Sequence, residues 1–142
     1  MIDQLSVCLP NRPGRLAEVC RLLGEWGVQI HAVTIAENVD FSIVRLICDR
    51  PRATAERLVR RGFDAVTTRL VAVEVADVPG ALGSLLDRLA SCDLNVDYAY
   101  ACSLGGRTVD VIHVSGEPLD VKLAETGLAL LDGDDLYVAD EA

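Results

Sequence analysis

One motif occurs twice in the chain, at a spacing of 66 residues. Asn11-Arg12-Pro13-Gly14-Arg15-Leu16 is repeated as Asp77-Val78-Pro79-Gly80-Ala81-Leu82. Gly27-Val28-Gln29-Ile30 is repeated at the same spacing as Asp93-Leu94-Asn95-Val96. Internal similarity at a fixed period indicates a duplicated structural unit. We therefore expect the 142 residues to form two similar domains, residues 1–68 and residues 69–142.

Both halves show the same order of strand and helix patterns. Alternating apolar residues predict strands, and apolar residues at helical spacing predict helices. In the first half these patterns give strands at 4–9, 28–36, 41–48 and 63–67, and helices at 14–26 and 52–61. In the second half they give strands at 70–76, 94–101, 108–114 and 128–131, and helices at 81–91 and 119–126.

This order of elements defines the expected fold. A βαββαβ unit is the ferredoxin-like, or split βαβ, arrangement. The expected fold class is therefore α+β, with two ferredoxin-like βαββαβ repeats whose antiparallel sheets carry the helices on one face. Residues Leu136–Ala139 align with the first strand of the second half and are expected to form one further strand.

Composition and charge exclude several classes of protein. The 13 Lys and Arg residues are outnumbered by 22 Asp and Glu residues, and the net charge of -9 disfavours nucleic-acid binding. Apolar runs are short and interrupted by charges, so we expect no membrane span, no secretion signal and a cytoplasmic location. The five cysteines include no C-x-x-C pair, which indicates reduced thiols.

The sequence contains no recognisable catalytic motif. G-x-S-x-G, the P-loop, G-x-G-x-x-G and H-E-x-x-H are all absent, so we expect no cofactor and no metal. His113 lies in an apolar strand, where a structural role satisfied by hydrogen bonds competes with a role as ligand or base. We expect a protein that is not an enzyme. The alternative, a small enzyme using carboxylates of the second half, would require a converging His–carboxylate pair.

The repeated loop lies between the first strand and the first helix of each half. Proline fixes φ, glycine permits a positive φ, and Asn11 or Asp77 can bond nearby backbone amides. The loop leads into a helix N-terminus, whose free N–H groups favour a carboxylate. Two compatible interpretations stay open: a tight turn with a helix cap and no ligand, or a site for an α-amino acid.

These features resemble the ACT domain family, here as a tandem pair covering nearly the whole chain. The resemblance rests on the βαββαβ order, the two Pro-Gly loops, and the segments 27–30 and 93–96 that lead into the second strand of each repeat. It implies regulatory modules that bind amino acids between paired units, using this loop and the second strand of the neighbour. Carried over to this chain, it implies ligand contacts at Asn11, Pro13, Gly14, Arg15, Leu16, Asp77, Pro79, Gly80, Ala81, Leu82, Asn95 and Tyr98.

The resulting hypothesis is a non-catalytic, allosteric regulatory or sensor protein that binds a small amino acid at ACT–ACT interfaces. The alternative is a structural or interaction module that dimerises or docks on a metabolic enzyme without binding a ligand. A homodimer is expected because the predicted sheets are apolar on both faces. Residues 1–70 contain 10 cations and 8 anions, whereas residues 71–142 contain 3 and 14. This polarity predicts that the first repeat faces a second repeat, of the same or another chain.

Overall fold

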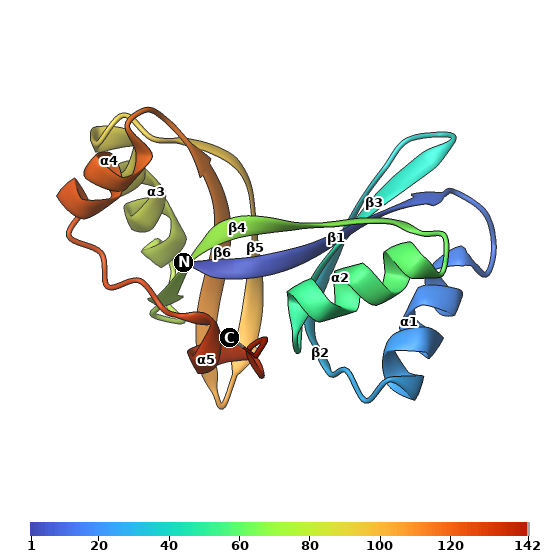
Figure 1. Ribbon diagram of the computed structural model, residues 1–142. Coiled ribbons are helices and arrows are strands. Elements are labelled where there is room, and N and C mark those ends of the chain that lie inside the picture. Colours follow the sequence, from blue (N-terminus) through green and yellow to red (C-terminus); the bar gives the residue numbers. More distant parts are fainter. Residues whose placement is uncertain (142) are drawn as a thin grey trace. The chain divides into compact units, whose positions relative to one another are not determined.

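The computed structural model describes residues 1–141. Its first half contains β1 (Ile2–Pro10), α1 (Arg15–Glu25), β2 (Ile30–Glu37), β3 (Phe41–Cys48) and α2 (Pro51–Arg60). The second half contains β4 (Asp64–Val75), α3 (Ala81–Ser91), β5 (Asn95–Leu104), β6 (Arg107–Ser115), α4 (Leu119–Glu125) and α5 (Gly133–Leu136) (Figure 1). The βαββα order occurs twice, and the predicted α+β class with two ferredoxin-like repeats is confirmed.

Contacts within the chain divide it into two compact units. The N-terminal unit comprises residues 3–68 together with the segment from Gly133 onward. The C-terminal unit comprises Met1–Ile2 and Arg69–Asp132. β4 begins in the N-terminal unit and ends in the C-terminal unit, so one strand supplies residues to both.

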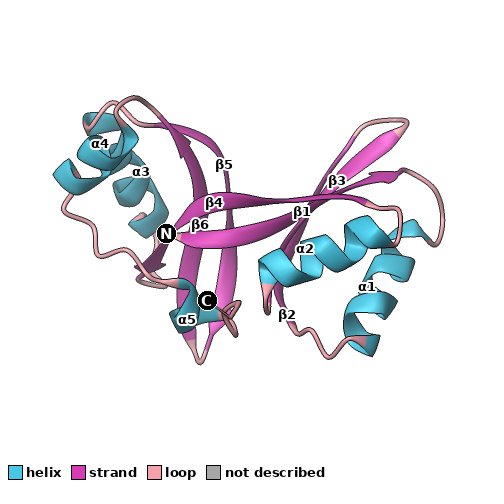
Figure 2. Cartoon of the chain, in the orientation of Figure 1, coloured by secondary structure: helices cyan, strands magenta, loops and turns pink. Residues whose placement is uncertain are grey.

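The N-terminal unit is a sheet in the order β2-β3-β1-β4, with α1 and α2 on one face (Figure 2). β1 and β2 both pair antiparallel with β3, with Val7 opposite Val44 and Val33 opposite Leu46. Alternate strand residues point towards the helices. The buried core formed in this way consists mainly of Leu5, Val7, Leu9, Val19, Leu22, Leu23, Val44, Leu46 and Leu58.

The C-terminal unit is a sheet in the order β4-β6-β5, with α3 and α4 on one face (Figure 2). β6 pairs antiparallel with both neighbours, and Gly105 and Gly106 close the β5–β6 turn with positive φ. The core beneath its helices consists of Val71, Val73, Leu85, Leu89, Leu94, Ile112, Val114 and Leu123.

Three segments differ from the predicted elements. The predicted strands 63–67 and 70–76 form one strand, β4, because no proline or glycine interrupts residues 63–75. Residues 128–131, predicted as a strand, are irregular and follow Gly127, although Leu131 N–H donates to the Ala72 carbonyl at 2.8 Å. The further strand predicted at Leu136–Ala139 is also absent. The short helix α5 ends at Leu136, with Asp134 and Asp135 in its first turn, where carboxylates favour a helix, and residues 137–139 are irregular.

The segment after Gly133 packs on the N-terminal unit. Leu136 and Tyr137 are buried, and the Tyr137 hydroxyl accepts a hydrogen bond from the Asp3 backbone at 2.9 Å. Asp140 places its two carboxylate oxygens 3.0 and 2.9 Å from the backbone nitrogens of Arg52 and Ala53. These amides belong to the first turn of α2, so Asp140 supplies the cap that the helix otherwise lacks.

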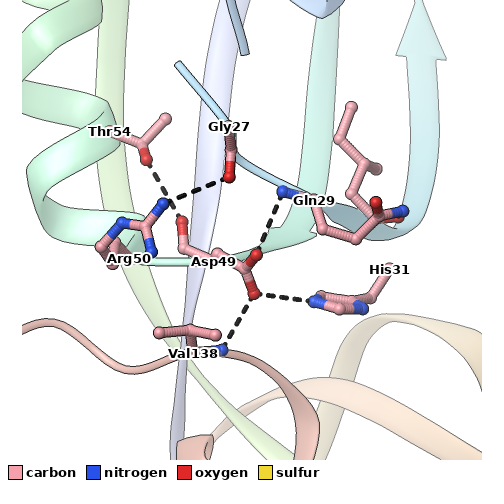
Figure 3. Close-up of polar contacts among 8 residues, drawn as sticks. Gly27, Gln29, His31, Asp49, Arg50, Thr54 and Val138 are labelled. Carbon is pink, nitrogen blue, oxygen red and sulfur yellow. Dashed lines mark hydrogen bonds and ion pairs between the residues drawn. The ribbon is translucent and has the colours of Figure 1, made fainter. Parts of the chain in front are cut away.

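Asp49, which directly follows β3, joins this segment to the sheet (Figure 3). Its carboxylate accepts hydrogen bonds from Val138 N–H at 2.9 Å and from Gln29 N–H at 3.1 Å, and it contacts His31 Nε2 at 2.9 Å. Arg50 N–H donates to the Val138 carbonyl at 2.7 Å. The start of β2, the end of β3 and the C-terminal segment therefore meet at one buried carboxylate.

No helix within residues 1–141 has both the length and the apolar character needed to cross a membrane. The cysteines of this part of the chain are free thiols, of which Cys48 and Cys102 are buried. Burial, together with the nearby carboxylates of Asp49 and Asp140, raises the pKa of Cys48 to about 12. Cys48 is therefore a protonated packing residue at neutral pH.

Candidate functional site

The loop between β1 and α1 forms a tight turn that ends at Gly14. Arg12 N–H donates to the Pro10 carbonyl at 2.9 Å, and Arg15 N–H donates to the Arg12 carbonyl at 3.4 Å. Gly14 precedes the helix with φ of 86°, a left-handed conformation that side chains disfavour. Gly14 thus uses the conformational freedom that the sequence provides at this position.

The loop between β4 and α3 has the same backbone conformation. Val78 N–H donates to the Ala76 carbonyl at 2.9 Å, and Ala81 N–H donates to the Val78 carbonyl at 3.3 Å. Gly80 has φ of 87° and takes the place of Gly14. The sequence repeat is therefore also a repeat of backbone geometry.

The interpretation as a tight turn with a helix cap holds for the turn, but the Asn11 and Asp77 side chains do not cap the helices that follow. Neither α1 nor α3 has a side-chain cap among the described residues. The Asn11 side-chain amide instead donates to the Asn38 carbonyl at 3.0 Å, and Asn11 N–H donates to the Asp40 carbonyl at 2.8 Å. Asn11 thus fastens its loop to the turn between β2 and β3. Within residues 1–141, no side chain accepts a hydrogen bond from the first-turn amides of either helix, so these amides can donate to an anion.

The side chains around the two loops differ. Arg15 lies 3.4 Å from Glu18, which offsets its charge, and its counterpart in the second loop is Ala81. Leu16 packs against the core of the N-terminal unit, whereas Leu82 is largely exposed. Pro13, Asp77 and Pro79 are exposed as well. The first loop carries the exposed Arg12 beside a partly apolar surface, and the second carries the exposed carboxylate of Asp77.

Asn95 and Tyr98 lie on β5 within a polar network that the sequence did not reveal. The Asn95 amide donates to Asp97 Oδ1 at 3.0 Å, and His113 Nδ1 lies 2.8 Å from Asp97 Oδ2. The Tyr98 and His113 rings stack with centroids 5.1 Å apart. Burial alone would raise the pKa of Asp97, but the hydrogen bonds from His113, Ser115 and Asn95 lower it below its usual value. Asp97 is therefore an anion at neutral pH.

Both histidines pair with carboxylates, His31 with Asp49 and His113 with Asp97. Pairs of this kind are what the enzyme alternative required. However, the Ser115 hydroxyl donates to Asp97 at 3.3 Å rather than to His113, so these residues do not form a nucleophile–base pair. Within residues 1–141, no group of three or more His, Cys, Asp and Glu side chains could hold a metal ion.

Two ferredoxin-like repeats with matching Pro-Gly loops define a class of small, paired βαββαβ proteins. A family profile described as an ACT domain pair matches residues 1–124. The chain therefore belongs to the ACT domain family, as the resemblance of its loops predicted. Members of this class are regulatory modules.

Solved structures agree with this assignment. A protein from Bacteroides thetaiotaomicron is 33% identical, the match covers 96% of this chain and 95% of that chain, and the TM-score is 0.85. The ligand-free regulatory subunit of aspartate kinase from Thermus thermophilus is 16% identical, with 88% and 90% coverage and a TM-score of 0.59. The corresponding subunit from Thermus flavus is also 16% identical, with coverage of 88% of this chain and 90% of that chain and a TM-score of 0.53. At this level of identity, the similarity to the two Thermus proteins concerns the fold alone. No match was found among the curated proteins.

Proposed function

We propose that the protein is a non-catalytic regulatory or sensor protein that binds a small amino acid at interfaces between ACT repeats. The observation that carries the proposal is the pair of loops with identical hydrogen-bonded turns, each placing a left-handed glycine before a helix with no side-chain cap. A helix N-terminus of this kind favours the α-carboxylate of an amino acid. The exposed carboxylate of Asp77 is suited to the ammonium group at the second loop.

The remaining contacts are proposed on the same basis. At the first loop, Asn11, Pro13, Gly14, Arg15 and Leu16 would surround the ligand, and at the second loop, Asp77, Pro79, Gly80, Ala81 and Leu82. Asn95 and Tyr98 are proposed to form a facing wall. The Asp97–His113 pair supports this role because it holds both residues in one orientation through a hydrogen bond and a ring stack.

We also propose that the chain works as a homodimer. β2 is an edge strand of its sheet, and it exposes Val33 and Ile35, which are 51% and 45% accessible. Phe41 and Ile43 on the neighbouring strand are similarly exposed. An apolar edge strand is suited to pairing with another chain. A ligand bound at a shared interface would then stabilise one arrangement of the repeats by linkage.

The protein regulated in this way is proposed to be a metabolic enzyme. Support comes from the fold shared with regulatory subunits of aspartate kinase. Co-purification of a larger enzyme, with no effect of any amino acid, would instead favour the interaction module that works without a ligand.

A thermal melting screen against the common amino acids tests the proposed ligand class. A ligand at 100 times its Kd stabilises the folded state by about 2.7 kcal/mol, which raises the melting temperature measurably. We expect a rise for one amino acid or a few chemically related ones. No rise for any of them at millimolar concentration would contradict the proposal.

Replacing Gly14 and Gly80 with valine is expected to abolish this ligand-dependent rise. The left-handed backbone costs a β-branched residue about 1–3 kcal/mol, and relief of that strain would move the amides that hold the carboxylate. Gly62→Val is the matched control, because Gly62 has φ of 89° and open space around it but follows the end of α2 and belongs to neither loop motif. It should lose similar stability and keep the ligand response. Binding that survives in the Gly14→Val, Gly80→Val double variant would show that the loops are turns and nothing more.

A further inference from the structure

The C-terminal unit contains a pocket at the end of β4. The pocket has a volume of about 390 Å³ and lies between the end of β4, one side of α3, and Leu128. Its lining includes Val73, Ser84, Leu85 and Arg88. The volume falls within the range of small-molecule sites in proteins.

Comparison of the two repeats explains why the space is open here. At the spacing of 66 residues, Arg15 and Glu18 of α1 correspond to Ala81 and Ser84 of α3. Thus a salt-bridged pair of long side chains is replaced by a methyl group and a hydroxyl group.

Two further replacements change the pocket. Phe63, which packs on the N-terminal core, aligns with the smaller Leu128. Leu22, a buried core residue, corresponds to Arg88, so the second repeat places a cation where the first has an apolar side chain. The segment from Leu128 to Leu130 forms no strand, so it leaves this part of the β4 edge uncovered.

The Arg88 guanidinium is the only strong charge in the lining without a partner. Among residues 1–141, no ion pair or side-chain hydrogen bond involves it, whereas Glu74 of the same lining lies 3.1 Å from Arg107. Lys122, another cation of this unit, is occupied by Asp93 at 2.9 Å. Arg88 therefore offers an uncompensated fork of N–H donors next to the Ser84 hydroxyl.

Apolar side chains complete the site. Val73 and Leu85 are buried core residues whose outer surfaces line the pocket, and Leu128 packs partly against the same core. A guanidinium and a hydroxyl beside an aliphatic floor match a molecule with a carboxylate at one end and a short branched chain at the other.

We propose that this pocket is a separate binding site for a small aliphatic carboxylate. The carboxylate pairs with Arg88 and Ser84, and the aliphatic group covers Val73, Leu85 and Leu128. The site lies wholly within the C-terminal unit, and of the two loop motifs only Ala81 contributes to its lining. It shares Ala81 with the second loop, but it can operate whether or not the first loop binds an amino acid.

The probe for this site is 4-methylpentanoate, titrated into the full chain and followed by amide NMR shifts. We expect saturable shifts at residues 73–76, 81–88 and 128. Its neutral amide, 4-methylpentanamide, should bind about tenfold more weakly or less, because it cannot form the charged pair with Arg88. Equal binding of acid and amide would overturn the proposal.

Two variants locate the site, and two others serve as controls. Arg88→Gln should weaken 4-methylpentanoate binding about tenfold or more, and Leu128→Phe should block it by restoring the side chain of the first repeat. Arg60→Gln removes an exposed arginine of α2 and should change nothing. Gly14→Val, which disables the first loop, should leave this binding intact. Shifts that persist in Arg88→Gln and Leu128→Phe would place the ligand elsewhere and refute the assignment.

Discussion

Replacing Asp49 with alanine is expected to lower the free energy of unfolding by about 3 kcal/mol and to release the segment after Gly133. The wild-type carboxylate is buried and receives hydrogen bonds from the backbone of Gln29 and Val138 and from the His31 ring (Figure 3). Alanine leaves these donors without an acceptor in a region of limited water access. The cost of unsatisfied donors is larger than the net value of the bonds themselves.

Urea denaturation and hydrogen exchange separate the two parts of this expectation. Urea denaturation gives the decrease in the free energy of unfolding. Hydrogen exchange should show fast exchange at Val138 and at the amides of Arg52 and Ala53, which Asp140 caps. Asp64→Ala is the control, since Asp64 is an exposed carboxylate in the same unit and its removal should change stability by less than about 0.5 kcal/mol. Unchanged exchange at Val138 in Asp49→Ala would mean that other contacts hold the segment.

The contribution of Asp49 should also depend on pH. Burial acts to raise the pKa of this carboxyl, but the hydrogen bonds from His31, Val138 and Gln29 outweigh it and hold the pKa below its usual value. A group with a lowered folded-state pKa stabilises the protein fully above its unfolded-state pKa of about 3.9. The difference between wild type and Asp49→Ala should therefore be constant near neutral pH and shrink as the pH falls below about 4.

Truncating Leu23 and Leu89 to alanine should each cost about 3 kcal/mol. These leucines are counterparts in the two repeats, and both are fully buried, Leu23 in the core of the N-terminal unit and Leu89 in that of the C-terminal unit. Each truncation removes apolar contacts and leaves a cavity that the surrounding core fills incompletely. Leu82→Ala, at an exposed position of α3, is the control and should cost well under 1 kcal/mol.

Hydrogen exchange on these two variants shows which strands and helices lose protection. We expect Leu23→Ala to raise exchange first in β1, β3 and α1, and Leu89→Ala to raise it first in β6, β5 and α3, because each side chain packs in one core. Equal increases in both units from either variant would indicate a single cooperative unit instead.

Periodicity and turn residues were enough to predict most of the fold. The helices and the hairpin strands depend on local patterns, and each was found within a few residues of its expected bounds. Residues 63–67 and 70–76 were predicted as two strands because the boundary between the repeats was expected near residue 68, yet no proline or glycine interrupts residues 63–75. Residues 128–131 were misassigned because a short apolar run fits a strand or an irregular buried segment equally well.

The backbone conformation of the two loops could be predicted from their sequence. The side-chain contacts between residues far apart in the sequence could not. The glycine of each Pro-Gly pair permits a positive φ, and both Gly14 and Gly80 adopt one. The partner of Asn11 lies 27 residues away, across a turn whose position only the folded sheet determines. The pairs of Asp49 with His31 and of Asp97 with His113 depend on strand register in the same way.

The return of the C-terminal segment to Asp49 constrains the order of events during synthesis. The first repeat emerges from the ribosome early, yet the acceptors for the α2 amides and the partner of the Arg50 backbone are made only after the entire second repeat. A nascent chain that has reached Thr68 therefore contains the backbone donors of Arg50, Arg52 and Ala53 before their acceptors have been synthesised. The N-terminal unit is therefore synthesised first, yet it acquires its last backbone contacts only when Val138 and Asp140 have been added.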